Sequence, residues 1–182
     1  MGIIEIILIG IGLSMDAAAV SMTNGMVYAK LSKTKFLMTA LAFGFFQALM
    51  PALGYFTGAL FAGVMEKYSG YVILIILGFI GGKMVKDGMT DCGEAECAKK
   101  EFTYALLLAQ AIATSIDAFA VGVGFAATHA NIALALPIIG MTTFIISLFA
   151  LAIGRKFGDK LGAKAEVLGG IILILIGIKA LF

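Results

Sequence analysis

Long apolar runs separated by short polar stretches organise the whole chain. A membrane-spanning helix needs about 20 predominantly apolar residues, and six runs approach this length. We expect spanning helices at residues 3–24, 36–61, 70–87, 102–127, 132–153 and 165–182. The polar sequence left between them is too short to form a separate soluble domain. The pattern therefore predicts an all-α integral membrane protein with one membrane domain, residues 1–182.

The composition excludes a soluble fold. Of the 182 residues, 62% are hydrophobic and 13% are charged, whereas roughly a quarter of a typical soluble domain is charged. A net charge of +2 gives no electrostatic reason to expect a nucleic-acid partner. The first apolar run is not preceded by the basic segment of a cleaved signal peptide, so we expect it to remain as a helix.

Lysine and arginine are distributed unevenly between the predicted loops. Eleven of the thirteen basic residues fall in the loops that follow the first, third and fifth helices; the other two are Lys67 and Lys179. Basic residues are enriched in cytoplasmic loops of membrane proteins. The three basic loops are therefore predicted to face the cytoplasm, with both chain termini outside.

The two halves of the chain resemble each other. The segment IGLSMDAAAV (11–20) aligns with IATSIDAFAV (112–121) at an offset of 101 residues, and LGFIGGKMV (77–85) aligns with LILIGIKAL (173–181) at an offset of 96. The offset of 96 also pairs Gly44 with Gly140, Gln47 with Thr143, Gly81 with Gly177 and Lys83 with Lys179. Chance similarity between apolar helices is the alternative, and the shared Ser-x-Asp-Ala-x-Ala-Val motif argues against it.

Each half contains an odd number of predicted helices, so the halves must cross the membrane in opposite directions. We expect an inverted pair: repeat one (1–88), an acidic cytoplasmic loop (88–101) and repeat two (102–182). Many secondary transporters follow this plan, with the substrate site near the bilayer midplane between the repeats.

One aspartate lies inside the first predicted helix and one inside the fourth, Asp16 and Asp117. A charged aspartate at a helix centre costs about 2.5–3.5 kcal/mol on insertion scales. We expect no basic partner at that depth, because Lys83 and Lys179 are predicted near opposite membrane faces and His129 in an outer loop. The carboxylates are then either protonated, acting as hydrogen-bonding groups between helices, or they bind a cation.

The inverted repeat would place these two aspartates across a central axis. Two carboxylates in a medium of low dielectric constant repel each other, and a divalent cation or protons would remove that repulsion. Exchange of a metal for protons is therefore chemically possible. Oxygen ligands favour Mg, Ca and Mn, and no cysteine or histidine is predicted inside the membrane. Together with Asp16 and Asp117, the candidate ligands are Ser14, Gln47, Thr114, Ser115 and Thr143.

Two further features each allow two interpretations. The many glycines are typical of close helix packing, although Gly122 and Gly124, just after Asp117, could instead unwind a helix and offer carbonyl oxygens to a cation. The acidic loop contains Cys92 and Cys97 among carboxylates. It could collect metal ions, or it could be a solvated connector, and the spacing of its two cysteines is not a common zinc pattern.

The segments SMDAAAVS, ATSIDAFAVGVG, GFFQALMPALGYFTG and KAEVLGGIILILIGIK resemble the MntP-type manganese efflux pumps of bacteria, which are grouped with the lysine-exporter-like transporters. The resemblance covers the whole chain. It implies Mn²⁺ export across the bacterial inner membrane, with Asp16 and Asp117 as the expected essential acids. Some relatives have a glutamate where this chain has Gln47, which leaves the metal affinity and the coupling stoichiometry open.

The sequence thus favours a secondary transporter in the lipid bilayer. Its expected substrate is Mn²⁺, with other divalent cations as further candidates, and it is expected to need no bound cofactor. No phosphate-binding loop is recognisable, so an ion gradient, such as that of protons, would drive it. The main alternative is an exporter of a small organic cation or amino acid. A non-transporting membrane subunit is a third hypothesis. A membrane enzyme is the least supported, because no nucleophile–base pair or metalloprotease motif is present. The sequence predicts no oligomeric state.

Overall fold

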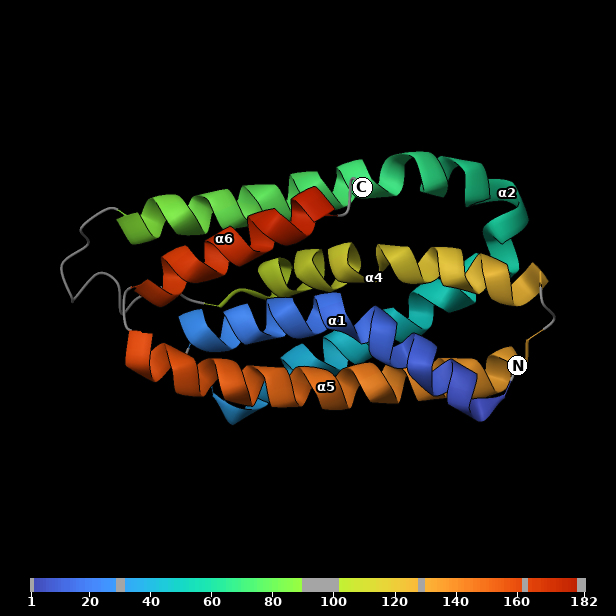
Figure 1. The fold of residues 1–182 in the computed structure, drawn as a ribbon, viewed down its shortest axis with the longest axis horizontal. Coiled ribbons are helices and arrows are strands. Elements are labelled where there is room, and N and C mark those ends of the chain that lie inside the picture. The colour runs from blue at the N-terminus through green and yellow to red at the C-terminus, as the bar shows by residue number, and fades with distance from the viewer. Residues whose placement is uncertain (1, 29–31, 90–101, 128–129, 162–163, 180–182) are drawn as a thin grey trace.

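A computed structural model describes residues 2–28, 32–89, 102–127, 130–161 and 164–179. Every regular element within these ranges is an α-helix, and the helices lie side by side along one long axis (Figure 1). In chain order they are α1 (Ile3–Val27), α2 (Lys33–Met89), α4 (Tyr104–Ala127), α5 (Ile132–Leu161) and α6 (Lys164–Lys179).

Helix α2 provides two arms of the bundle. It turns back on itself near one end of the molecule, so that its second arm runs opposite to its first (Figure 1). The polar stretch 62–70 was expected to be a break between two helices, and this expectation was wrong: the backbone stays helical through it. The stretch contains no proline, and Met65, Glu66 and Lys67 are good helix formers.

Among the residues that the structure describes, four helical segments are long and apolar enough to cross a bilayer. They are Ile3–Val27, Lys33–Thr57, Tyr104–Ala126 and Ile132–Phe157. The third and sixth predicted spans correspond to two shorter apolar helices, Leu74–Lys83 and Val167–Lys179. The chain is therefore a multi-pass membrane protein whose helices differ in length.

The described part of helix α6 is shorter than a full membrane span. It has 16 residues, which at about 1.5 Å per residue give roughly 24 Å, less than a hydrocarbon core of about 30 Å. In Figure 1 α6 starts at one end of the bundle and stops about half-way along it. Its last described residue, Lys179, therefore lies inside the bundle's length and not at its end.

Glycines set the close helix crossings. Helix α1 packs mainly on α5, the first arm of α2 on α4 and α5, and the second arm of α2 on α6. A Cβ atom on Gly44 would lie 2.8 Å from the carbonyl oxygen of Gly140, and one on Gly81 would lie 2.5 Å from that of Gly170. Because no real side chain tolerates such distances, these crossings require glycine.

Two apolar clusters fill the interior. The Phe43 cluster consists of Ala17, Val20, Phe43, Leu77, Phe102, Leu107, Ala111, Ala113, Ile116 and Leu173. The Ile139 cluster consists of Ile6, Leu13, Ala118, Phe125, Ala130, Ala135 and Ile139. On α1 the boundary between them falls between Leu13 and Ala17, and on α4 between Ile116 and Ala118. Asp16 and Asp117 lie at this boundary.

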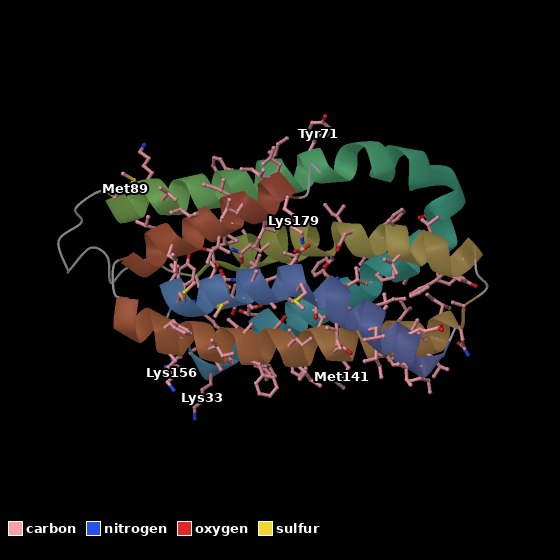
Figure 2. The ribbon with its side chains drawn as sticks, viewed as in Figure 1. Lys33, Tyr71, Met89, Met141, Lys156 and Lys179 are labelled. Atoms are coloured by element: carbon pink, nitrogen blue, oxygen red, sulfur yellow. The ribbon has the colours of Figure 1, made fainter. Side chains whose placement is uncertain are left out.

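The ends of the helices fit the predicted alternation of loops. The last turns of α1, α5 and the second arm of α2 lie at the same end of the bundle as the first turns of α2, α4 and α6 (Figure 1). Lys33, Lys156 and Met89 lie in the part of the bundle nearer that end (Figure 2). The helix ends that flank the loops expected on one membrane side therefore share one end of the molecule. Which side of the membrane this end faces stays a prediction.

Candidate metal site

Two aspartates on different helices lie at the boundary between the same two apolar clusters. Asp16 on α1 and Asp117 on α4 are each partly buried. The Asp117 carboxylate also accepts a hydrogen bond of 2.9 Å from the N–H of Ala118. Both copies of the repeated motif therefore place their aspartate at the same boundary of the core, and a shared site for the two carboxylates stays a prediction.

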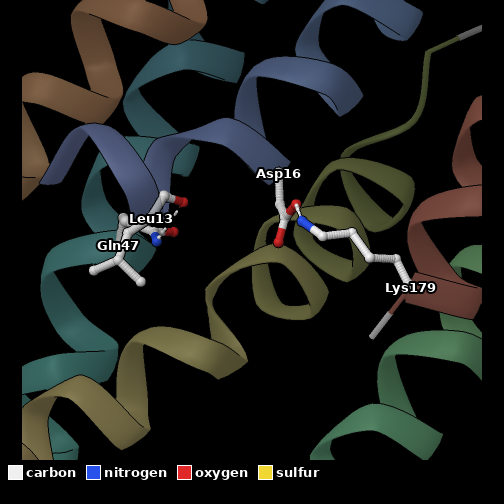
Figure 3. Close-up of polar contacts among 4 residues, drawn as sticks. All are labelled: Leu13, Asp16, Gln47 and Lys179. Atoms are coloured by element: carbon white, nitrogen blue, oxygen red, sulfur yellow. Dashed lines mark hydrogen bonds and ion pairs between the residues drawn. The ribbon is translucent and has the colours of Figure 1, made fainter. Parts of the chain in front are cut away.

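Lys179 contacts Asp16, contrary to expectation. Its Nζ atom lies 3.5 Å from Oδ1 of Asp16 (Figure 3). The sequence interpretation placed Lys179 near a membrane face and left the aspartates without a basic partner. That interpretation was wrong for Asp16, because α6 ends part-way along the bundle and carries its last described residue to the level of the aspartates.

Gln47 lies on the first arm of α2 and reaches α1. Its Nε2 atom donates a hydrogen bond of 3.0 Å to the carbonyl oxygen of Leu13, three residues before Asp16 (Figure 3). Its Oε1 atom is fully buried and has no hydrogen-bond partner. Pro51, four residues later, has no N–H to bond the main-chain carbonyl of Gln47. The position therefore offers unused oxygen acceptors close to α1.

The three predicted hydroxyl ligands next to the aspartates are buried and bonded to their own helices. Ser14 Oγ donates to the Ile11 carbonyl at 2.7 Å, Thr114 Oγ1 to the Gln110 carbonyl at 3.0 Å, and Ser115 Oγ to the Ala111 carbonyl at 2.7 Å. Donation fixes each hydroxyl hydrogen and leaves oxygen lone pairs for another partner. A cation is a partner of that kind.

Thr143 on α5 is the fifth predicted neutral ligand. Its side chain is fully buried and its Oγ1 atom has no hydrogen-bond partner. It follows Gly140 by three residues, as Gln47 follows Gly44, and these two glycines meet at the crossing of α2 with α5. Both residues thus lie one helical turn from the same crossing.

Sequence reasoning missed several buried polar groups. Asn24 on α1 and Gln110 on α4 form a reciprocal amide pair, with hydrogen bonds of 2.8 and 3.2 Å. Buried hydroxyls without a partner are also present at Ser21, Thr23 and Ser147. Polar residues on apolar helices are a visible signal, but only the packing shows which of them face one another.

The glycines after Asp117 do not unwind α4. The helix is continuous through Gly122 and Gly124, so the idea that these residues expose carbonyl oxygens to a cation was wrong. A Cβ atom on Gly122 would overlap the backbone of Pro51, whereas one on Gly124 would have no atom within 4 Å. Close packing of α4 on α2 therefore accounts for Gly122.

Comparison with known proteins now adds to this geometry. The sequence profile of the family described as "Putative manganese efflux pump" matches residues 30–181. The chain belongs to the MntP family. No solved structure matches it.

Members of the MntP family from several bacteria are similar over nearly the whole chain. A protein of Ruminiclostridium cellulolyticum named "Putative manganese efflux pump MntP" is 42% identical over 179 residues, 98% of this chain and 95% of its own. The relative of the same name from Bifidobacterium adolescentis is 44% identical over 180 residues, covering 99% and 96% of the two chains. "Putative manganese efflux pump MntP 2" of Clostridium botulinum strain Hall is 44% identical over 188 aligned positions.

The donor set in this MntP-family chain is restricted. Among the described residues, no three His, Cys, Asp or Glu side chains gather closely enough to hold a metal ion. Within the described residues, a metal site on the two aspartates would draw its other ligands from neutral oxygens, a donor set that suits a hard cation better than zinc or copper. The loop with Cys92 and Cys97, which was predicted either to collect metal ions or to be a solvated connector, lies outside the described residues. His129 also lies outside them.

Proposed function

We propose that this protein is a secondary transporter that exports Mn²⁺ from the cytoplasm through a site built on Asp16 and Asp117. The observation that carries the proposal is the placement of both aspartates, on α1 and α4, at the boundary between the same two apolar clusters. The names of the MntP-family relatives supply the metal and the direction of transport. The bacterial inner membrane, with the basic loops in the cytoplasm and both termini outside, is part of the same proposal.

The two halves of the chain act as inverted repeats in this proposal. Helix contacts support this repeat relation, because contacts between the two halves recur between the residues that lie 96 positions away in the opposite half. Gly44 and Gly140, which that offset equates, pack against each other. It also equates Leu74 with Gly170 and Gly81 with Gly177. Accordingly, Gly81 packs on Gly170, and a Cβ atom on Gly177 would lie 3.2 Å from Cα of Leu74.

Mn²⁺ would neutralise the two aspartates and take its remaining ligands from neutral oxygens. Gln47 Oε1 and Thr143 Oγ1 are buried without a partner, and the hydroxyls of Ser14, Thr114 and Ser115 retain lone pairs. Oxygen donors of this kind match the preference of Mn²⁺. A polar group left unpaired in the interior costs about 1–3 kcal/mol, and a bound cation would recover part of that cost.

The packing supports alternating access. The Phe43 cluster closes the aspartate level toward one end of the bundle and the Ile139 cluster closes it toward the other. Opening one cluster at a time, by rocking one repeat against the other, would expose the site to each side in turn. Exchange of Mn²⁺ for protons on the carboxylates would couple export to the proton gradient. The protein itself carries out no chemical conversion and uses Mn²⁺ as cargo.

Metal content of manganese-loaded bacteria that lack their own exporter tests the proposal. The wild type should lower cell manganese, while Asp16→Asn and Asp117→Asn should leave it at the empty-vector level. Glu5→Gln is the matched control, because Glu5 lies on the same helix as Asp16 and is exposed. Membrane expression of every variant must be checked.

Two outcomes would contradict the proposal. If manganese stays unchanged with well-expressed wild type, Mn²⁺ is not the substrate and export of an organic cation or amino acid becomes the better hypothesis. If the Asp16 and Asp117 variants export as well as the wild type, the carboxylate site is wrong.

A further inference from the structure

The ion pair between Lys179 and Asp16 joins the end of α6 to the middle of α1. The Lys179 side chain is 76% exposed and reaches from α6 to a carboxylate that is 32% exposed, with 3.5 Å between Nζ and Oδ1 (Figure 3). Lys179 ends the apolar helical segment Val167–Lys179, and an unpaired charge within the bilayer is costly. Among the described residues, Lys179 is the basic side chain that contacts the proposed metal ligands.

This ion pair breaks the symmetry of the repeats. The repeat offsets equate Lys179 with Lys83 and Asp16 with Asp117, so the equivalent pair is Lys83 with Asp117. That pair is not formed: Lys83 is exposed and makes no ion pair within the described part of the chain. The surrounding helices do obey the symmetry, because the second arm of α2 and α6 cross at equivalent positions. The two repeats therefore differ in which lysine pairs with which aspartate, while the crossing of the second arm of α2 with α6 follows the repeat symmetry.

A pair of inverted repeats has two equivalent asymmetric states. If the halves exchange their conformations when the site turns from one side of the membrane to the other, every asymmetric contact is replaced by its repeat equivalent. The Lys179–Asp16 pair of this state then becomes a Lys83–Asp117 pair in the opposite state.

We propose that Lys179 and Lys83 are alternate internal counter-ions of the empty site: Lys179 neutralises Asp16 in the state described here, and Lys83 neutralises Asp117 in the oppositely facing state. The proposal rests on the function proposed above. The metal ion and the lysine compete for the same carboxylate, so Mn²⁺ displaces the ammonium on binding. The lysines assist only the transporter without metal, because the loaded site is neutralised by its cargo.

Net efflux and Mn²⁺ exchange distinguish a lysine that serves only the metal-free transporter from a lysine that stabilises the fold. Net efflux requires the empty transporter to reorient after each release, whereas exchange of labelled for unlabelled Mn²⁺ across one membrane needs only the loaded form. Loss of an internal counter-ion should slow the first and spare the second. A merely structural lysine would affect both together.

The experiment uses the full chain in proteoliposomes, with radioactive Mn²⁺ as the probe. The variants are Lys179→Gln and Lys83→Gln, with Lys179→Arg as the variant that keeps the charge. Lys156→Gln is the matched control, because Lys156 is an exposed lysine at the end of the bundle (Figure 2). Net efflux and Mn²⁺ exchange are measured on the same preparations.

We expect net efflux to fall at least about tenfold in Lys179→Gln and in Lys83→Gln, with exchange within about twofold of the wild type. Lys179→Arg and Lys156→Gln should retain both activities. Unchanged net efflux in either glutamine variant would overturn the proposal, and so would an equal loss of efflux and exchange. A wild type without either activity would instead refute Mn²⁺ transport itself, so the two failures are distinguishable.

Discussion

At the scale of single residues, the side chain of Gln47 combines a used donor with an unused acceptor. Its Nε2 atom bonds the Leu13 carbonyl, while its Oε1 atom is buried without a partner. Buried polar groups are nearly always hydrogen-bonded, so the free oxygen is costly in the metal-free protein. A residue that stabilised only the fold would not need this oxygen, whereas a residue that binds a cation would.

Replacement of Gln47 by leucine separates these roles. Because Gln47→Leu removes one hydrogen bond and one unpaired buried atom together, we expect the free energy of unfolding to change by no more than about 1 kcal/mol. Mn²⁺ transport should fall about tenfold, since a ligand is lost. Thermal unfolding in detergent and transport in proteoliposomes measure the two effects. Thr57→Val, on the same arm, is the control, and wild-type transport by Gln47→Leu would exclude Gln47 from the site.

At the scale of helices, glycine determines which surfaces can meet. The crossing of α4 with the first arm of α2 brings the Gly122 Cα against the Pro51 backbone, and the crossing of α2 with α5 joins Gly44 to Gly140. In a bilayer the hydrophobic effect does not drive helices together, so close backbone approach and van der Waals contact must do so. The small residues around the aspartates are thus explained by packing.

Two glycines on α4 offer a matched test of this explanation. Gly122→Ala should lower the free energy of unfolding by about 1–3 kcal/mol, because the added methyl group overlaps the Pro51 backbone. Gly124→Ala should be neutral or slightly stabilising, because its Cβ position is open and alanine favours helix. Denaturation of the purified proteins compares them. Equal effects at both positions would show that helix propensity, and not the crossing, decides the outcome.

At the scale of the whole molecule, α1, the second arm of α2 and α5 all end at the same end of the bundle (Figure 1). Lys33 and Lys156 mark that end (Figure 2), and Gly2 begins α1 at the other. The bias of basic residues predicts that the lysine end is cytoplasmic.

Cysteine labelling of intact cells measures this orientation. In a background with Cys92 and Cys97 replaced by serine, a membrane-impermeant maleimide should label Gly2→Cys. Lys33→Cys and Lys156→Cys should react only after the cells are permeabilised. All three positions are exposed, so poor access would not explain a negative result. Labelling of the lysine positions from outside would reverse the topology and, with it, the direction of transport.

Several residues of the candidate site could be proposed from the sequence because they belong to a repeated local pattern. The repeated motif identified Asp16 and Asp117, and the repeat offset selected Gln47 and Thr143 as equivalent positions. Lys179 was misjudged because a sequence shows where an apolar run ends but not at which depth. The amide pair of Asn24 with Gln110 was missed because its members are 86 residues apart and occupy positions that the repeat does not equate.

Hydropathy by itself determined that this chain is helical and membrane-embedded, since only helices satisfy every backbone hydrogen bond within one apolar segment. The internal repeat, also visible in the sequence, pointed to a pair of carboxylates. Only the tertiary structure decided that α2 turns without a helical break, that α6 stops within the bundle, and that a lysine contacts Asp16. These features depend on how closely helices approach and how far each extends, and both are set by backbone contacts between segments distant in sequence.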